Sequence, residues 1–444
     1  MKVLKSYSVK KWLIFGLPIL AMCLVIACSK DDGKTDDGTG GSDDDPTPKT
    51  MTFTSFSPVE GERGSTVELT GTNFSTTASE NTVKFGTVDA EVTDATSGSL
   101  TVTVPDNATS GTISVSTGAT TVISTNEFEV YEPAKWTQVK SYPNEEGRSA
   151  GVSFVINDII YHGLGSTFDH LTEHQLWSYI PELDDWFRET DFPNADDQLT
   201  SSAVFVIGNK AYIVGGSSLE NGDSSEVWEY DPTIGGEGGM WTLMETPFPG
   251  TGKVQAVGFS IDGKGYIAGG GYDNGEFTQK VDEVWMYDPT NDSWTEKMDF
   301  PGSAFTRGLS FVVDSKAYVH LGRTEEDGNG SNEFWEYSPS GDTWVEKASI
   351  PGKRSGAFGF AMDGKVYIGY GSDYDQNQHT AIHRQDFMVY NPTTNDWTDL
   401  ITPEGVATRS GAISHAVNGI GYMGLGSENG VSTDFWKFEP RKRL

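Results

Sequence analysis

Cysteine is almost absent from this chain of 444 residues. The only two, Cys23 and Cys28, lie near the N-terminus, so the sequence beyond residue 28 carries no thiol. Disulfide bonds, cysteine-ligated metals and a cysteine nucleophile are therefore excluded from everything that follows.

Positive charge is also scarce, with 31 Lys and Arg against 64 Asp and Glu and a formal net charge of −33. Binding to a phosphate backbone requires a basic surface, so nucleic acid is excluded as a partner. Helical periodicity is lacking after residue 30, whereas 52 glycines punctuate the chain. These features predict an all-β fold.

The longest apolar run, from Trp12 to Ala27, is shorter than the roughly 20 residues that a membrane-spanning helix requires. Four lysines precede it, as in a secretory signal peptide. It ends Leu24-Val25-Ile26-Ala27-Cys28, which resembles the lipobox of bacterial lipoproteins. The resemblance implies a signal peptide over residues 1–27, cleavage after Ala27, and membrane attachment through a lipid on Cys28.

Residues 28–50 have the composition of a tether. The segment SKDDGKTDDGTGGSDDDPTPKT contains seven Asp and no aliphatic or aromatic side chain, so it cannot bury enough surface to order itself. Acidic residues directly after the lipidated cysteine also resemble an export tag of outer-membrane lipoproteins. We therefore expect an outer-membrane protein that faces outward, while a plain solvated spacer stays the alternative.

Residues 51–132 alternate apolar and polar side chains in short stretches separated by turns, which predicts a small β-sandwich. The turns resemble those of an IPT/TIG domain, an immunoglobulin-like fold. That resemblance rests on Ser57-Pro58, Gly61, Gly64-Ser65-Thr66-Val67, Gly71-Thr72-Asn73-Phe74, Lys84-Phe85-Gly86, Val104-Pro105 and Ser110-Gly111.

Residues 135–440 are built from repeats about fifty residues long, the period of a β-propeller blade. Copies of Trp-x-Tyr-x-Pro, most followed by a second Trp, start at Trp177, Trp228, Trp285 and Trp335, with divergent copies at Met388 and Trp436. Each copy follows a Tyr-containing strand that ends in glycine, such as AYIVGGS (211–217) and GYIAGGG (265–271). The pattern resembles the kelch repeat and implies a six-bladed propeller.

Only five of the six repeats have a complete final strand. Trp136-Thr137-Gln138-Val139, followed by Pro143, fits the vacant place. We therefore predict that this N-terminal strand completes the last blade and closes the ring, which protects the sheet edges. The repeated Trp and Tyr residues are expected to pack between blades rather than bind sugars.

One constellation indicates a ligand site. In four of the six repeats, the residue 13 positions before the second-strand Tyr is a lysine or an arginine. In a fifth repeat, an arginine lies two residues after that position. All of these fall where first strands begin, on one rim of the predicted channel. The set is Arg148, Lys253, Arg354, Arg409 and Arg307. These cations either bind an anionic ligand or pair with neighbouring loops.

Long variable loops are expected on the same rim and carry residues suited to sugar or peptide recognition. We single out Tyr272, Tyr374, His379 and His383. No metal-binding motif, nucleophile elbow or phosphate loop is present, so no metal and no cofactor are predicted. The copper oxidases among kelch propellers use a Tyr–Cys cross-link, which this propeller cannot form.

Three functional hypotheses remain at this point. The favoured one is a non-catalytic, lipid-anchored module that displays a glycan- or protein-binding ring. The second is a carbohydrate-active enzyme on the same ring, because some bacterial six-bladed kelch proteins are sialic-acid mutarotases. The third is a purely structural envelope protein.

Overall fold

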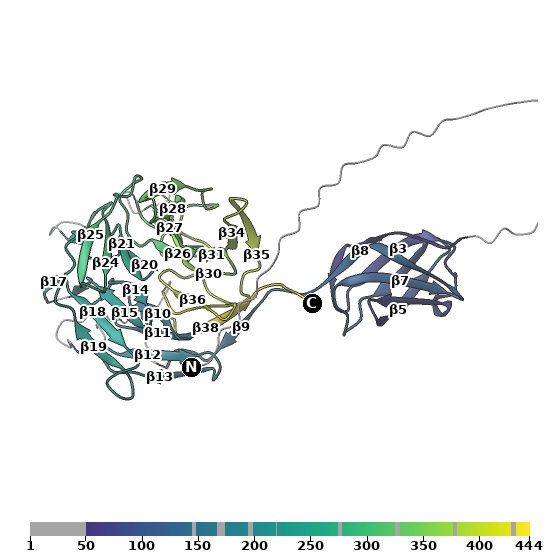
Figure 1. Cartoon of the computed structure of the whole chain (residues 1–444), viewed down its shortest axis with the longest axis horizontal. Helices are drawn as coiled ribbons and strands as arrows, with labels where there is room; N and C mark the ends of the chain where they lie inside the picture. The colour runs from purple at the N-terminus through teal and green to yellow at the C-terminus, as the bar shows by residue number, and fades with distance from the viewer. Residues whose placement is uncertain are drawn as a thin grey trace, which may run out of the picture. The chain divides into compact units, whose positions relative to one another are not determined.

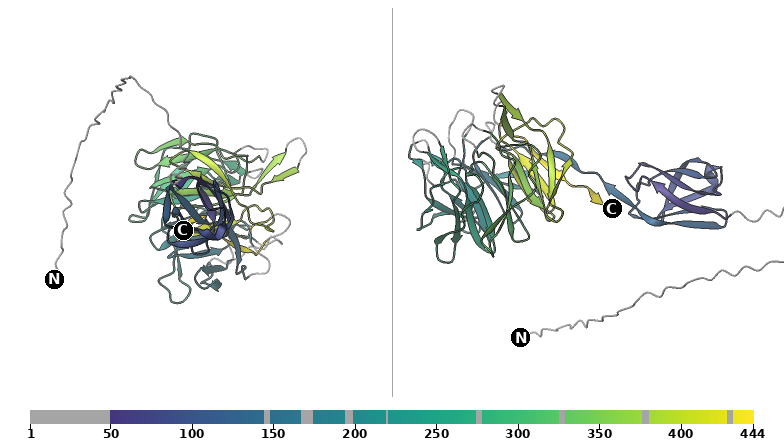
Figure 2. Two further views of the ribbon diagram at one scale, coloured as in Figure 1. Left: turned by 90° about the vertical axis from the view of Figure 1, so that its right-hand side faces the viewer. Right: turned by 90° about the horizontal axis from the view of Figure 1, so that it is seen from above.

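The computed structural model describes residues 50–143, 148–166, 174–193, 199–218, 220–273, 278–324, 329–375, 380–427 and 432–444. The predicted signal peptide, Cys28, His379 and all of the tether except Thr50 lie outside these residues. The described chain is all-β, with one short 3-10 turn at Ala78–Glu80, and both views of Figure 2 show strands throughout. This confirms the predicted fold class.

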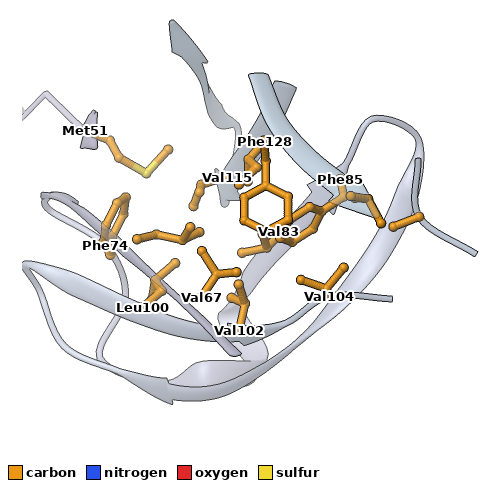
Figure 3. Close-up of a cluster of buried hydrophobic side chains, with 14 residues drawn as sticks. Met51, Val67, Phe74, Val83, Phe85, Leu100, Val102, Val104, Val115 and Phe128 are labelled. Atoms are coloured by element: carbon orange, nitrogen blue, oxygen red, sulfur yellow. The ribbon is translucent and has the colours of Figure 1, made fainter. Parts of the chain in front are cut away.

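The N-terminal domain is a sandwich whose core comes from alternate residues of its strands. In β3, for example, Val67 and Leu69 point inward and are fully buried, while Glu68 and Thr70 are exposed. Figure 3 shows Val67, Leu100 and Phe128 converging in this core. The strands are β1 (Thr52–Ser57), β2 (Glu60–Glu62), β3 (Thr66–Thr72), β4 (Asn81–Phe85), β5 (Val88–Ala95), β6 (Ser99–Thr103), β7 (Gly111–Thr117) and β8 (Thr120–Glu132).

Of the strands that follow β8, 24 form six four-stranded antiparallel sheets, which are the blades. Blades 1 to 3 are β10 (Val152–Ile156), β11 (Ile159–Gly163), β12 (Leu176–Ile180), β13 (Asp185–Arg188); β14 (Ala203–Ile207), β15 (Lys210–Val214), β18 (Val227–Asp231), β19 (Met240–Leu243); and β20 (Val257–Ile261), β21 (Lys264–Ala268), β24 (Val284–Asp288), β25 (Ser293–Glu296). Blades 4 to 6 are β26 (Leu309–Val313), β27 (Lys316–His320), β28 (Phe334–Ser338), β29 (Thr343–Glu346); β30 (Phe358–Met362), β31 (Lys365–Gly369), β34 (Phe387–Asn391), β35 (Asp396–Leu400); and β36 (Ile413–Val417), β37 (Ile420–Gly424), β38 (Phe435–Glu439), β9 (Lys135–Val139). Figure 1 shows β10, β14, β20, β26, β30 and β36 around the centre of the ring.

Blade 6 confirms the predicted ring closure. Its outermost strand is β9, which pairs antiparallel with β38 and sets Trp136 opposite Phe438. The indole of Trp136 packs edge-on against Phe358 and Phe387 of blade 5 and donates its N–H to the Ile401 carbonyl oxygen at 3.1 Å. The two ends of the propeller therefore hold each other in one sheet.

Aromatic packing and hydrogen bonds join each blade to the next. In blade 1 the Tyr179 hydroxyl donates to Asp184 Oδ1 at 2.8 Å, and the same oxygen accepts the backbone N–H of Lys140 at 2.7 Å. The indole N–H of Trp186 donates to the Lys140 carbonyl at 3.0 Å. Trp241, Trp344 and Trp397 repeat this contact in other blades. The Trp and Tyr residues of these repeats are therefore structural, as predicted.

The paired glycines of the kelch pattern let neighbouring blades approach closely. Gly215 has φ of 65°, and a Cβ there would lie 2.4 Å from the Lys253 carbonyl oxygen of blade 3. That oxygen accepts a hydrogen bond from the Gly216 N–H at 2.7 Å. A side chain at residue 215 would separate the two blades, so glycine is required there.

The last residues of the chain pair with the sandwich. Strand β39 (Lys442–Arg443) runs antiparallel to β8, and Leu444 packs against the sandwich core. Arg441 forms ion pairs of 2.8 Å with both Glu60 and Glu129 and lies over the ring of Tyr131. The chain thus returns to its N-terminal domain after completing the ring.

Candidate functional site

The innermost strands of the six blades enclose a cavity of about 710 Å³. This volume lies within the range of about 300–1,000 Å³ that is usual for small-molecule sites. Serines and small aliphatic residues make up much of the wall, including Ser153, Ser310, Val204 and Ala361. The cavity is therefore wide enough for a sugar and offers it both hydroxyl groups and apolar surface.

At one mouth of the cavity, the residue two positions before each first strand has a left-handed backbone. These six residues, one from each blade, are Ala150, Ser201, Gln255, Arg307, Gly356 and Gly411, with φ between 55° and 69°. Several are linked from blade to blade by backbone hydrogen bonds, such as Ser201 N–H to Ala150 O at 2.8 Å and Arg307 N–H to Gln255 O at 3.0 Å. We call this set the mouth ring.

Blade 4 departs from the other blades at this mouth. Its mouth-ring residue is Arg307, where four other blades have Ala, Ser or Gly. The bridge partner of the adjacent Thr306 is Arg323, whereas the equivalent partners elsewhere are serine or glycine: Ser166, Ser217, Gly271, Ser372 and Ser427. Blade 4 thus has arginine at two positions where most other blades have small residues.

Neither arginine has an acidic partner within ion-pair distance among the described residues. Arg307 donates from Nε to Gln255 Oε1 at 3.2 Å, and the buried Nε of Arg323 lacks a hydrogen-bond partner in the described structure. Arg307 is exposed to the cavity, yet the walls around it desolvate the guanidinium and, with the charge of Arg323, lower its pKa. Arg307 lines the cavity and feels the charge of Arg323, so this pair of cations is suited to attract an anion.

The wall of the cavity opposite Arg307 carries the two histidines among the described lining residues, which are suited to proton transfer. Blades 1 and 6 meet at this wall, and blade 4 is three blades from blade 1 and two from blade 6. The Ser153 hydroxyl of blade 1 is hydrogen-bonded to His415 Nε2 of blade 6, and His162 lies beside them. Burial lowers the pKa of His415 to about 4, so its imidazole is neutral at pH 7.

The predicted ring of cations is only partly open to a ligand. Arg148, Arg354 and Arg409 are 1 %, 0 % and 3 % exposed. Arg354 makes a two-pronged contact with Asp386 at 3.0 and 2.7 Å, and Arg409 does the same with Asp434. Arg148 donates to Gln175 Oε1 at 3.0 Å. The structure thus places these three inside their blades, where they pair with the following loop.

The other predicted rim residues lie on or near projecting hairpins. Lys253 is partly buried and has no described carboxylate within ion-pair distance. Tyr272 belongs to the hairpin β22 (Gly271–Asp273) with β23 (Thr278–Lys280), while Tyr374 and His383 belong to β32 (Ser372–Asp375) with β33 (Thr380–His383). A third hairpin, β16 (Ser217–Ser218) with β17 (Gly222–Asp223), touches the first, because Asp223 Oδ2 accepts the Asp273 N–H at 2.7 Å.

Sequence reasoning missed Arg323 and His415, although both are visible as breaks in the repeat. Phenylalanine stands seven residues before the second-strand Tyr in five blades, and His415 takes that place in the sixth. Arg323 ends the motif AYVHLGR, where the other second strands end in serine or glycine. A comparison of the repeats position by position would have found both.

The described residues offer neither a cluster of metal ligands nor a membrane-spanning helix. No group of three or more His, Asp or Glu is arranged to hold a metal ion. No described helix is long and apolar enough to cross a membrane.

Comparison with known families supports the architecture. Residues 51–130 match the IPT/TIG domain family, and residues 256–301, which span blade 3, match the Kelch motif. A solved structure of YjhT superposes with a TM-score of 0.57 at 16 % identity, covering 67 % of this chain and 95 % of that one. The chain is an IPT/TIG domain followed by a six-bladed propeller.

Curated relatives share shorter segments. N-acetylneuraminate epimerase of Shigella flexneri is 35 % identical over 91 residues, which is 20 % of this chain and 24 % of the relative. N-acetylneuraminate epimerase 2 of Escherichia coli O6:H1 is 31 % identical over 130 residues, which is 29 % of this chain and 33 % of the relative. The matches thus span a quarter to a third of these enzymes. Because relatives of the ring are named as enzymes, the favoured hypothesis of a non-catalytic display module is wrong, and the enzymatic alternative takes its place.

Proposed function

We propose that this protein is a sugar epimerase that acts on N-acetylneuraminate or a closely related acidic sugar inside the propeller cavity. The observation that carries the proposal is the Arg307–Arg323 pair at the cavity mouth. N-acetylneuraminate bears a carboxylate on its anomeric carbon, and guanidinium groups are suited to bind a carboxylate through two parallel hydrogen bonds.

The epimerised centre in this proposal is the anomeric carbon. The sugar ring opens to a ketone and closes again on the other face, which requires only that protons move between oxygen atoms. The two arginines hold the carboxylate and thereby fix the reacting carbon in the cavity. Each charge-assisted hydrogen bond contributes about 1.5–3 kcal/mol to binding.

Anomer exchange of N-acetylneuraminate, followed by NMR, tests this function directly. The sugar is supplied as one anomer, released at the start of the reaction, and the approach to equilibrium is timed with and without the ectodomain from residue 51 onward. We expect acceleration in proportion to enzyme concentration. The neutral sugar N-acetylmannosamine is the matched control, because without a carboxylate it gains nothing from the arginine pair. An unchanged rate for N-acetylneuraminate would refute the assignment.

Lipid anchoring at Cys28 and outward display at the outer membrane form a second, separate proposal. It rests on the Leu24–Cys28 motif and the acidic residues that follow. The Cys28→Ala variant is expected to lose labelling by a fatty-acid analogue and to leave the membrane fraction. Protease added to intact cells should degrade the wild-type protein if it faces outward. Unchanged labelling of Cys28→Ala would rule out the anchor without affecting the enzymatic proposal.

A further inference from the structure

One substitution in the blade repeat has no packing rationale. In most blades the phenylalanine of the first strand stacks on the second-strand tyrosine, as in Phe154 with Tyr161, whose ring centres lie 5.1 Å apart at 11°. Blade 6 has His415 opposite Tyr422 instead. An imidazole in this position costs desolvation that a phenyl ring does not. The histidine therefore needs a reason other than packing.

The partner of His415 supplies one. Ser153 lines the cavity, and its hydroxyl is hydrogen-bonded to His415 Nε2 across the boundary between blades 1 and 6. The serine at the same position of blade 4, Ser310, donates instead to the Gly258 carbonyl at 2.8 Å, which is a purely structural contact. Ser153 alone among these wall serines thus joins the cavity to a base.

A second histidine beside the pair has spare hydrogen-bonding capacity. His162 donates from Nδ1 to the Val152 carbonyl at 3.0 Å, and its buried Nε2 has no hydrogen-bond partner in the described structure. His162 lines the same cavity and is only 1 % exposed. A polar atom buried in this way is expensive unless a ligand or water completes its hydrogen bonds.

We propose that Ser153 and His415 form the proton relay that opens and closes the sugar ring, which rests on the proposed function above. The anomeric hydroxyl donates to Ser153 Oγ. As its proton passes to Ser153, the serine proton passes to His415 Nε2, and the electron pair of the anomeric O–H forms the carbonyl. The bond from the anomeric carbon to the ring oxygen breaks, and its electron pair stays on that oxygen.

The cycle needs no external reactant. The ring oxygen takes the proton back from the His415 imidazolium through Ser153, which leaves the enzyme in its starting state. Rotation of the open chain exposes the other face of the ketone, and the same steps in reverse close the ring. Because the carboxylate and the anomeric hydroxyl share one carbon, relay and arginines must approach that carbon from different sides. Blades 1 and 4 lie on opposite sides of the cavity and meet this requirement.

Two substitutions test the proton relay without disturbing the fold. His415→Phe gives blade 6 the residue of the other five, and Ser153→Ala removes the hydroxyl. Both should lower kcat for anomer exchange about a hundredfold, the low end of the range for acid–base catalysis. KM should change less than twofold, since the carboxylate contacts are intact. Ser178→Ala, the matched control, removes a serine hydroxyl of blade 1 that lies outside the cavity wall and donates to Glu189 Oε1 at 2.5 Å, so it should keep kcat within twofold.

Chemical rescue separates a proton relay from a structural role. His415→Ala leaves a hole, and added imidazole should restore at least a tenth of the lost kcat, while N-methylated imidazolium salts, which cannot accept a proton, should not. A wild-type kcat in His415→Phe, or equal effects of both compounds, would overturn the relay while leaving the epimerase assignment standing. A wild-type protein without epimerase activity would overturn both.

Discussion

Arginines occur in two environments in this propeller, and the contrast separates scaffold from site. Inside the blades, Arg354 and Arg409 are buried and paired with Asp386 and Asp434. At the cavity mouth, Arg307 and Arg323 stand together with no described acidic partner. The buried pairs follow the repeat, whereas the mouth pair breaks it. Departures from the repeat therefore indicate function, and adherence to it indicates structure.

The difference has an energetic basis. A buried ion pair is costly to break, because the partner that remains is a buried charge without compensation. Two adjacent like charges have the opposite property, since removing either relieves repulsion and burial cost. A bound anion would offset the repulsion within such a pair, and the two sets of arginines can be told apart by stability alone.

The largest expected effect is on the blade arginines. Replacing Arg354 and Arg409 together by alanine should lower the free energy of unfolding by several kcal/mol, since breaking one buried pair costs about 3–5 kcal/mol. Thermal unfolding followed by circular dichroism measures the loss. Adding Asp386→Ala and Asp434→Ala should recover part of it, because no unpaired carboxylate then remains. A melting temperature equal to that of the wild type would mean that Arg354 and Arg409, like the arginines at the mouth, do not stabilise the fold.

An intermediate effect is expected from acid. Burial, reinforced by the charge of Arg148, lowers the pKa of His162 to about 3, and burial lowers that of His320 to about 4. The unfolded chain therefore binds protons more readily, so stability is full above about pH 6.5 and declines as pH falls towards these values. Lowering the pH from 7 to 4.5 should therefore reduce the free energy of unfolding by about 2 kcal/mol for each of these histidines.

The control for the acid effect uses residues that other blades already have. His162→Ile and His320→Val copy Ile213 and Val214 of blade 2. When unfolding by urea is measured at pH 7 and at pH 4.5, the free energy of unfolding of this double variant should differ less between the two pH values than that of the wild type. An identical pH dependence would mean that carboxylates, such as Asp434 with its lowered pKa, account for the acid sensitivity.

The smallest effect on stability, and a large one on binding, is expected at the mouth. Arg307→Ala with Arg323→Ser gives blade 4 the residues that blade 1 has at these positions, Ala150 and Ser166. The melting temperature should stay the same or rise, while KM for N-acetylneuraminate should increase at least tenfold, consistent with about 1.5–3 kcal/mol for a lost charged hydrogen bond. A drop in stability as large as that of the blade variant would remove the distinction between the two sets.

The fold was predictable from the sequence because six copies of one pattern predict the same four-stranded blade. The place of Trp136 in blade 6 followed from one vacant slot in a regular pattern. The pairing of the rim arginines did not follow, because Arg354 and Asp386 are 32 residues apart, with a loop of variable length between them. No periodicity fixes such a contact. Arg323 and His415 were readable as exceptions, but only once the repeats were aligned to one another.

The mouth ring joins blades through backbone atoms alone, which has a consequence for adaptation. A hydrogen bond from Arg307 N–H to Gln255 O places no demand on either side chain. A left-handed backbone disfavours branching at Cβ, and the six residues found there, Ala, Ser, Gln, Arg, Gly and Gly, all comply. Small and long polar residues therefore both occur at this mouth, although a Cβ at Gly356 would lie 2.0 Å from Ser410 Oγ. The side chains at the non-glycine positions can therefore differ from blade to blade while the backbone bonds that join the blades stay the same.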